Sequence, residues 1–361
     1  MRTLLFVSFI SLLINSVQSS ILSRFQEWAS NHSIDLSDAL IKTHIYSNWV
    51  ENDKYIIEMN SMNLTFTLAH NAYSGYSSEE FSEIMGFDSV AINKVDSEAT
   101  EYDSETINDA TARNLRGLPL DLVISTPLPS SIDWRSKDVV NPIQDQGQCG
   151  SCWAFSTIQA VESATAIKYG SLPKLSEQEL VDCDTFANGG RDHGCNGGQM
   201  DNAFTWIGKN GGVCSESAYP YTSGLSKTSG SCTEKSCSSV AHTYVASHVD
   251  IQINSDNAMM TALMKQPVSV AIEADQKAFQ LYSTGVFTAE CGTNLDHGVG
   301  LVGYGTLNDV DYYILRNSWG ISWGDKGYMY LARGNDPTTG KPYNGGAGQC
   351  GVLGQGSYPI V

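Results

Sequence analysis

The sequence predicts an α+β protein with two lobes, one helical and one built of strands. From Trp153 to Ile167, apolar residues recur at the spacing of a largely buried helix that ends before Gly170. After Gln266 the character changes to segments rich in Val, Ile and Tyr that are broken by Gly or Asp. The predicted strands cover residues 267–274, 298–305, 310–317 and 327–333. A helical half followed by a strand half is typical of an α+β fold with a cleft between its lobes.

Composition and charge narrow the function classes. The 361 residues are 41% hydrophobic and 17% charged, which is ordinary for a globular protein. The formal net charge of −18 argues against a nucleic-acid partner, because neutralising phosphates requires clustered Lys and Arg. The Cys and His spacings do not match a zinc-binding pattern, so we expect neither a metal nor another cofactor. We expect a monomer.

Residues 1–19 are interpreted as a cleaved signal peptide. Arg2 precedes an apolar run from Leu4 to Ile14, and small residues end the segment at Ser19. The run is shorter than the roughly 20 residues that span a bilayer, which argues against a membrane anchor. We therefore expect the secretory pathway, with disulfide formation and a final location in a lysosome or vacuole or outside the cell.

Residues 20–87 contain no cysteine and predict a helical region. Apolar residues between Leu40 and Met59 recur at intervals of three, four and seven, the pattern of one long amphipathic helix. Two glycosylation sequons begin at Asn31 and Asn63. Short sequons also arise by chance, so each is only a candidate site.

Residues 88–127 predict an acidic linker. Asp and Glu stand there among Ser, Thr, Asn and Ala with few large apolar residues, a composition that cannot bury enough surface to order itself. Such a segment is accessible to proteases, so we expect an activation cleavage within it. All nine cysteines follow, in a separate domain that we assign to residues 128–361.

Cys152 is the candidate nucleophile. It follows Gly150 and Ser151 in the stretch QGQCGSCWAFS and begins the predicted helix. Free amide groups and the helix dipole at this end favour a thiolate, the attacking form of cysteine. A cysteine in a secreted protein is more often half of a disulfide, but nine cysteines leave one over.

His297 is the histidine we select as the base for Cys152, out of seven. It directly precedes an apolar predicted strand, and Asn317 at the end of another strand is a candidate to orient its second ring nitrogen. Taken singly, the histidine would more often be a core residue and the asparagine a turn residue. Spacing alone does not select this pair.

Three separated motifs resemble the papain-like cysteine proteases of the cathepsin L type. They are residues 146–156, the Asp-His-Gly at 296–298 and NSWGISWG at 317–324. Shorter matches occur at 132–135 (IDWR), 194–198 (GCNGG) and 266–270 (QPVSV), and the resemblance extends over nearly the whole chain after the signal segment. It implies a two-lobed papain-like fold, with a helical lobe, an antiparallel β-barrel-like lobe and an N-terminal helical propeptide.

The resemblance implies a role for each catalytic residue. Cys152 would attack the peptide carbonyl as a thiolate paired with protonated His297, which then gives its proton to the leaving amine before water hydrolyses the thioester. The side-chain amide of Gln146 and the backbone N–H of Cys152 would form the oxyanion hole. Asn317 would orient His297, and Trp319 would shield their hydrogen bond from water.

The resemblance also implies a cleft for protein and peptide substrates. Gly197 and Gly198 would let an extended peptide lie against their backbone as an added strand. The main specificity pocket would be lined by Met200, Ala271, Leu295 and Gly298, with Gln355 at its far end. Trp319 and Trp323 are further substrate-side candidates, although packing is the ordinary role of such a pair. An apolar pocket predicts Leu or Phe at the second residue before the cut, and poor acceptance of Arg.

Eight cysteines remain once Cys152 is set aside. The resemblance implies the pairs Cys149–Cys195, Cys183–Cys232 and Cys291–Cys350. Cys214 and Cys237 are left over, and a fourth bridge between them is our hypothesis. In the alternative, Cys183 pairs with Cys237.

Residues 20–87 resemble the family's inhibitory propeptide, with two departures. One helix motif reads Ile41, Ile45, Trp49, Asn52, Ile56 and Asn60, where the first two positions usually carry Glu and Arg. A second motif reads Ala69, Asn71, Tyr73 and Gly75, where the last is usually Asp. We expect the region to block the cleft, with Phe25, Trp28 and Phe81 as packing residues. The carboxylate that would sense acid at this position is missing.

Two other classes are weighed against this assignment. Cys149 and Cys152 form a CxxC before a helix, as in redox proteins, and such a protein would link these two thiols. A protease-like binding or storage protein usually lacks the nucleophile, whereas this chain keeps Cys152 together with Gln146, His297 and Asn317.

Overall fold

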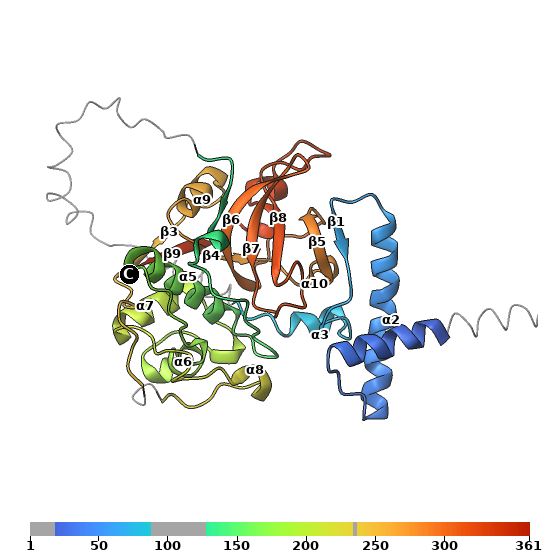
Figure 1. The fold of residues 1–361 in the computed structure, drawn as a ribbon, viewed down its shortest axis with the longest axis horizontal. Helices are drawn as coiled ribbons and strands as arrows, with labels where there is room; N and C mark the ends of the chain where they lie inside the picture. The colour runs from blue at the N-terminus through green and yellow to red at the C-terminus, as the bar shows by residue number, and fades with distance from the viewer. Residues whose placement is uncertain (1–18, 88–127, 234–236) are drawn as a thin grey trace, which may run out of the picture.

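A computed structural model describes residues 19–87, 128–233 and 237–361 (Figure 1). The predicted signal peptide, except for Ser19, and the predicted linker lie outside these residues. Helices α5, α6 and α7 lie on one side of the molecule, the strands in the middle, and α2 on the far side of the strands (Figure 1). The predicted two-lobed α+β fold is confirmed. Among the described residues, no helix is both long and apolar enough to cross a membrane.

The N-terminal region is mainly helical, as predicted. Residues 19–31 form a helix, followed by α2 (Ala39–Ser61), β1 (Phe66–Leu68) and α3 (Ser78–Ser82). The side chain of Asp38 caps α2 by accepting the N–H groups of Leu40 and Ile41. Phe25 and Trp28 are buried against Trp49 of α2, so these two predicted packing residues are confirmed.

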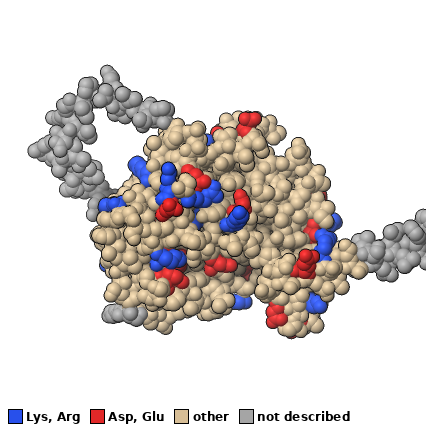
Figure 2. All heavy atoms as spheres, in the orientation of Figure 1, with Lys and Arg blue, Asp and Glu red and all other residues tan. Residues whose placement is uncertain are grey.

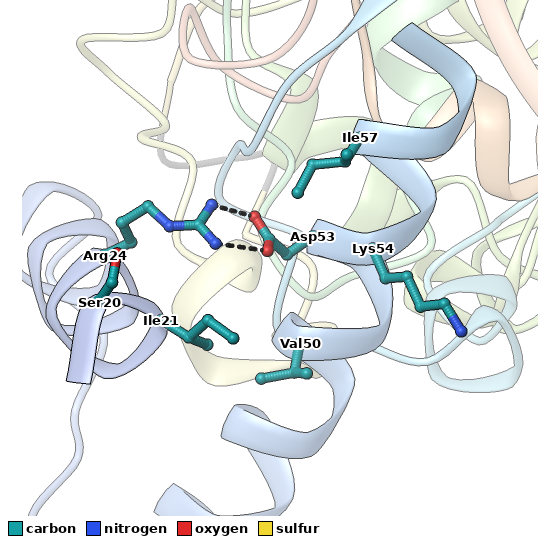
Figure 3. Close-up of a pocket in the computed structure, with 7 residues that line it drawn as sticks. All are labelled: Ser20, Ile21, Arg24, Val50, Asp53, Lys54 and Ile57. Atoms are coloured by element: carbon teal, nitrogen blue, oxygen red, sulfur yellow. Dashed lines mark hydrogen bonds and ion pairs between the residues drawn. The ribbon is translucent and has the colours of Figure 1, made fainter. Parts of the chain in front are cut away.

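The charges of this region lie away from the positions where the family motif usually carries them. Ile45 stands where the motif usually has Arg, and Gly75 where it usually has Asp. The two are in close contact, because a Cβ on Gly75 would come within 2.8 Å of the Ile45 side chain. Instead, Arg24 of the first helix donates two hydrogen bonds, of 2.5 and 2.8 Å, to the buried carboxylate of Asp53 in α2 (Figure 3). His70 lies 3.1 Å from the same carboxylate. Arg24 and Asp53 also line an open cavity of about 530 Å³ between these two helices.

The helical lobe is built on α5 (Cys152–Tyr169), which packs against α6 (Glu177–Cys183) and α7 (Met200–Asn210). The helix predicted to end before Gly170 is confirmed. Gly170 follows α5 with φ 76°, a left-handed conformation that glycine adopts without strain. The turn η4 (Gly194–Asn196) and the short helix α8 (Ser223–Ser226) complete the lobe.

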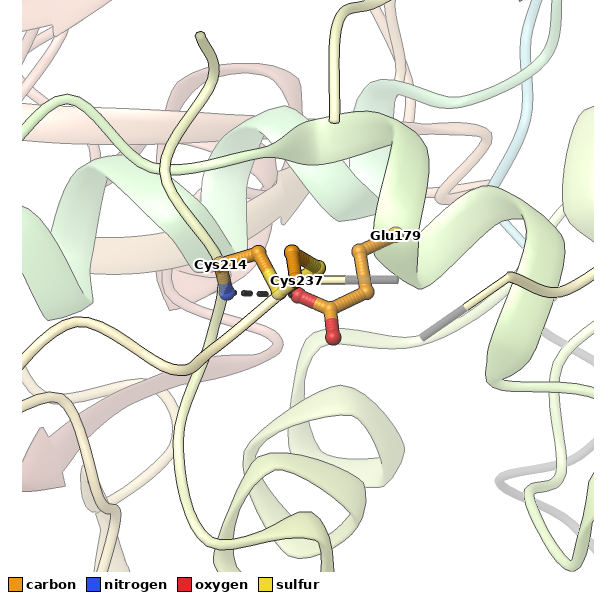
Figure 4. Close-up of side chains that lie close together, drawn as sticks. All are labelled: Glu179, Cys214 and Cys237. Carbon is orange, nitrogen blue, oxygen red and sulfur yellow. Dashed lines mark hydrogen bonds between the residues drawn. A yellow bond between two sulfur atoms is a disulfide. The ribbon is translucent and has the colours of Figure 1, made fainter. Parts of the chain in front are cut away.

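Ser176 caps α6 by accepting the N–H of Glu179 at 3.0 Å. The N–H of Ser176, which a capping box would give to Glu179, instead donates to the carbonyl of Cys214 at 3.0 Å. The Glu179 carboxylate accepts the N–H of Cys214 at 2.7 Å (Figure 4). The N–H of Ser176 and the carboxylate of Glu179, which would bond to each other in a capping box, therefore both bond to Cys214 instead.

The second lobe is built on a mostly antiparallel sheet with two short helices, α9 (Asp256–Leu263) and α10 (Lys277–Gln280). Its strands run in the order β1-β5-β8-β7-β6-β4-β9-β3, β2 pairs with β6, and only the pairing of β5 with β8 is parallel. The bounds are β2 Ile132–Asp133, β3 Ser247–Asp250, β4 Val268–Ile272, β5 Tyr282–Phe287, β6 His297–Leu307, β7 Val310–Arg316, β8 Tyr328–Ala332 and β9 Gly356–Ile360. The four predicted strands correspond to β4, β6, β7 and β8.

The N-terminal region adds a strand to this sheet. β1 pairs antiparallel with the edge strand β5, and Phe66 lies opposite Gly285. A Cβ on Gly285 would come within 2.4 Å of the Thr65 carbonyl oxygen, so glycine permits this close approach. The pairing fastens the N-terminal region to the second lobe through backbone hydrogen bonds.

Four disulfides join the eight remaining cysteines. They are Cys149–Cys195, Cys183–Cys232, Cys214–Cys237 and Cys291–Cys350, the pairs expected above (Figure 4 shows the third). The alternative pairing of Cys183 with Cys237 is wrong. Cys152 remains a free thiol, and Cys149 is bonded elsewhere, which also contradicts the redox interpretation of the CxxC stretch.

Acidic and basic side chains lie interspersed on the face shown in Figure 2, with wide uncharged areas between them. The net negative charge of the chain is therefore not gathered into one field on this face.

Candidate active site

The four candidate catalytic residues meet where α5 packs against β6. Cys152 is the first residue of α5 and His297 the first of β6, while Asn317 directly follows β7 and Gln146 precedes α5. All four are buried. The hydroxyl of Ser156 in α5 donates to the Val299 carbonyl in β6 at 2.7 Å, which ties the two lobes together beside the site.

Hydrogen bonds fix the orientation of both reactive groups. The Cys152 sulfur accepts the N–H of Gly298, the neighbour of His297, at 3.3 Å. Nε2 of His297 lies 2.8 Å from Oδ1 of Asn317, so Nε2 is the nitrogen that carries the hydrogen. Nδ1 has no hydrogen-bond partner among the described residues, which leaves its lone pair available for a proton. The Trp319 ring stacks on the imidazole with centroids 4.6 Å apart.

The covered site favours neutral forms of both groups. Cys152 and His297 are each 0% exposed. Burial raises the pKa of the Cys152 thiol to about 11 and lowers the pKa of His297 to about 4, because a charge loses its hydration there. The expectation of a thiolate at this helix terminus is therefore wrong for the covered site. The N–H groups of Gly298 and Gly86 act in the opposite direction on the thiol, but burial outweighs them.

The side chain of Gln146 is held from two sides. Its Oε1 accepts the hydroxyl of Ser318 at 2.7 Å, and its Nε2 donates to the carbonyl of Cys149 at 3.0 Å. The same Nε2 lies 3.3 Å from the carbonyl oxygen of Ile84 in the N-terminal region. Ser318 was not among the residues singled out from the sequence, although it stands next to Asn317. It fixes which end of the amide is the donor.

The N-terminal region covers the site through its last described residues. Gly198 donates its N–H to the Gly86 carbonyl at 3.0 Å, and Phe87 donates to the Asp296 carbonyl at 3.0 Å. A Cβ on Gly86 would lie 1.9 Å from the Gly150 carbonyl oxygen, so only glycine fits at position 86 without a shift of the backbone. Phe81 packs edge-on against Trp319 at 5.1 Å, as expected of a packing residue.

Three residues of the expected specificity pocket lie in or against a buried apolar cluster that also contains a side chain of the N-terminal region. Phe87 belongs to the same buried apolar cluster as Met200 and Ala271, and Leu295 packs against this cluster. A Cβ on Gly298 would lie 3.1 Å from the Met200 sulfur, so a side chain at position 298 would crowd Met200. Gln355 is partly exposed, and its carbonyl accepts the N–H of Ala271 at 3.1 Å.

Trp323 lies behind Trp319, in the core of the second lobe. Its ring meets that of Trp319 edge-on at 5.1 Å, and its Nε1 donates to the carbonyls of Phe279 and Gln280 at 3.3 and 3.2 Å. Both tryptophans are fully buried. Trp323 therefore packs against the ring of Trp319 and helps to hold it in place.

Two groups of potential metal ligands occur among the described residues. Glu179, Cys214 and Cys237 lie close together, but the two sulfurs are bonded to each other and offer no thiolate (Figure 4). Asp201, His248 and Asp250 form the second group, in which Asp201 already accepts the hydroxyl of Ser357.

Comparisons with known proteins agree with this geometry. The family model described as papain family cysteine protease matches residues 128–360. The chain is 43% identical to the probable cysteine protease RD21B of Arabidopsis thaliana over 310 residues, which is 86% of this chain but 59% of that protein. It is 40% identical to the thiol protease SEN102 of Hemerocallis sp. over 348 residues, 95% of this chain and 87% of that one. The proform of the ragweed pollen allergen Amb a 11, a cysteine protease, superposes with a TM-score of 0.77 at 30% identity and covers 95% of both chains.

Fold, site and relatives together define a cysteine endopeptidase in its zymogen form, with its propeptide as an intramolecular inhibitor. The chain belongs to the papain family of cysteine proteases and is of the cathepsin L type.

Proposed function

We propose that this chain is the precursor of a secretory-pathway endopeptidase that prefers an apolar residue at the second position before the cut. Residues 20–87 are the inhibitory propeptide, residues 88–127 carry the activation cleavage, and residues 128–361 form the mature enzyme. Removal of the propeptide admits water to the site, which lowers the cost of charging Cys152 and His297.

The proposed reaction begins with a proton transfer from the Cys152 thiol to Nδ1 of His297. Asn317 holds the opposite ring nitrogen, so the imidazolium keeps its orientation while the thiolate attacks the peptide carbonyl. The amide of Gln146 and the N–H of Cys152 stabilise the charge on the former carbonyl oxygen. His297 then protonates the leaving amine, and water attacks the thioester to release the second product.

The position of Phe87 is the observation that carries the proposed substrate preference. Its backbone pairs with Gly198, and its ring lies in the apolar cluster with Met200 and Ala271. A pocket that holds the chain's own phenylalanine fits a substrate side chain of the same kind. Burying such a side chain contributes about 1.5–3 kcal/mol.

Several observations support the proposed secretory route. Four disulfides are typical of an oxidising compartment, and both sequon residues, Asn31 and Asn63, are exposed and accessible to glycosylation. A relative with 39% identity, CEP2 of Arabidopsis thaliana, is named a KDEL-tailed cysteine endopeptidase, and KDEL is a retention signal of the endoplasmic reticulum. The mature enzyme would act in a lysosome or vacuole or outside the cell.

A peptide-library profile tests the proposal. The full chain is processed at mildly acidic pH with a thiol reductant, and the cleavage products of the library are sequenced. We expect Leu and Phe to dominate the second position before the cut. Alkylation of the processed enzyme should abolish cleavage, whereas the covered precursor should react slowly because its thiol is neutral and buried. A profile dominated by Arg, or cleavage that survives alkylation, would contradict the proposal.

Replacing Gly86 by alanine should weaken the inhibition by the propeptide. The added methyl group would overlap the Gly150 carbonyl, and overpacking of this kind costs about 1–3 kcal/mol, a factor of roughly 5 to 150 in the population of the open site. The alkylation rate of Cys152 in the unprocessed chain should rise by that factor. Ser82→Ala, at an exposed position of α3, is the control. Equal rates for both variants and the unmodified chain would show that the contact is not inhibitory.

A further inference from the structure

Two buried carboxyl groups, those of Asp184 and Asp192, lie in contact beside the glycines of the substrate cleft. They are 0% and 2% exposed, and their side chains are within hydrogen-bonding reach of each other. Their backbones are joined as well, because the N–H of Asp192 donates to the Asp184 carbonyl at 3.1 Å. Asp184 directly follows α6, and Asp192 lies in the loop before η4.

Each carboxyl group has one oxygen supplied with donors and one without. Oδ1 of Asp184 accepts the N–H of Arg191 at 3.1 Å. Oδ1 of Asp192 accepts the N–H of Gln199 at 3.0 Å and the side-chain amide of Asn202 at 3.1 Å. Both Oδ2 atoms are buried and have no donor among the described residues. Two ionised carboxylates in contact repel each other, whereas one proton between them gives each oxygen a partner.

The charged surroundings assign the proton to Asp192. Burial raises the pKa of Asp184, whereas the contact with Asp192, the backbone N–H of Arg191 and the charge of Lys209 in α7 act in the opposite direction. Burial and the neighbouring Asp184 raise the pKa of Asp192 well above its usual range. We therefore take Asp192, the one that contacts the substrate side, as the partner that carries the proton.

Asp192 is packed directly against the cleft glycine. A Cβ on Gly198 would lie 2.8 Å from the Asp192 carboxyl carbon and 2.6 Å from the Trp153 indole, so the glycine backbone is clamped between the two. The next residue, Gln199, donates its N–H to Asp192, and the Gly197 carbonyl accepts the N–H of His193 at 2.8 Å. The N–H of Gly198 itself points into the cleft, where it holds the propeptide carbonyl of Gly86 at 3.0 Å.

We propose that Asp184 and Asp192 share one proton, and that this pair positions Gly197 and Gly198 to bind the substrate backbone in acid. The inference rests on the proposed function, because it assumes that these glycines bind the substrate. Loss of the proton leaves two facing carboxylates, which push the Asp192 segment away and displace the N–H of Gly198. Asp192 is thus a positioning residue that acts through Gly198, and it links substrate affinity to pH.

The sign of the pH effect follows from linkage. A carboxyl group whose pKa is higher in the folded state than its unfolded value of about 3.9 stabilises the fold fully below that value, and the stabilisation is lost as pH rises through the raised pKa. The pair should therefore favour the folded cleft in acid and weaken it towards neutral pH.

Asparagine at either position supplies a permanent hydrogen in place of the shared proton. In Asp192→Asn the oxygen can still accept from Gln199, while the NH₂ group donates to Asp184. The first measurement is the melting temperature of the full chain from pH 4 to pH 8, in a Cys152→Ala background that prevents self-processing. We expect each single variant to lose part of the fall in melting temperature with rising pH. The double variant, with two amides facing each other, should be less stable than either single one.

The second measurement tests the positioning role of Asp192 separately from the shared proton. KM and kcat of the processed enzymes are compared at pH 5 and pH 7.5, with Asp309→Asn at an exposed turn as the control. Loss of about one backbone hydrogen bond predicts a KM rise of about fivefold with pH in the unmodified enzyme and in the control, with little change in Asp192→Asn. The pH profile of kcat should be alike in all three.

Each outcome decides one point. Melting curves with the same pH dependence in all chains would overturn the shared proton. An altered melting profile with an unaltered KM profile would overturn the positioning role and leave the protease assignment intact. Absence of peptide cleavage by every processed chain would refute the proposed function, and with it the positioning role, while the melting curves would still decide on the shared proton.

Discussion

Cys152→Ala and His297→Asn should each lower kcat by roughly 10⁵- to 10⁶-fold, the loss found when a nucleophile or its base is removed from a protease site of this kind. The alanine has no atom to form the thioester. The asparagine cannot take the thiol proton, so the attacking thiolate is not formed. Because the two groups act as one unit, the double variant should be no less active than either single variant.

The measurement uses a fluorogenic peptide with Leu or Phe at the second position before the cut. The variants cannot process themselves, so an added protease must remove their propeptides, and mass spectrometry confirms the same mature chain in each case. His242→Asn, at an exposed histidine stacked on Tyr169, is the matched control and should keep full activity. A His297→Asn enzyme within tenfold of the unmodified one would rule out His297 as the base. Processing of the Cys152→Ala precursor without added protease would assign activation to another enzyme.

Gln146→Ala should lower kcat by roughly 10²- to 10³-fold with little change in KM, the usual effect of removing one oxyanion donor. The amide of Gln146 is oriented by Ser318 before any substrate arrives, so it stabilises developing charge without rearranging. The carbonyl of Ile84 already lies against this donor in the covered form. Ser318→Ala should cause a smaller loss, because it only frees the amide to rotate.

Gln148→Ala is the control for this series, since Gln148 is exposed and, within the part of the chain that the structure describes, its side chain hydrogen-bonds only to Tyr76 of the propeptide. It should leave kcat of the processed enzyme unchanged. A loss confined to KM in Gln146→Ala would mean that the amide binds the ground state and the transition state equally. That result would exclude an oxyanion role.

Elements with a strong local pattern could be predicted from the sequence. Helix α5 was found from its apolar spacing and from Gly170, and β6 and β7 from runs of branched and aromatic residues. Strands β3 and β9 were not predicted, since β9 carries Gly356 and Pro359 and depends on its pairing with β3 and β4. The strand β1 was also missed, because it exists only as a partner of the distant β5.

In the candidate site, too, some residues could be predicted from the sequence and others were found only from their contacts in the structure. Cys152, His297 and Asn317 were selected from their motifs, but Ser318 became visible only through its contact with Gln146. The altered propeptide motif showed that a charge pair was missing. It did not show that Arg24 and Asp53 form an ion pair elsewhere in the same region.

The sequence by itself determined the chemical inventory of this protein, namely one unpaired cysteine with a histidine, an asparagine and a glutamine to serve it, and the family to which these motifs belong. Only the tertiary structure decided the pKa shifts and the contacts of these residues. It showed that burial raises the pKa of the covered thiol and lowers the pKa of the imidazole, that Phe87 lies in one apolar cluster with Met200 and Ala271, and that Asp192 donates its N–H to the Asp184 carbonyl. The physical reason is that protonation depends on lost hydration and on neighbours from distant segments, neither of which a local pattern contains.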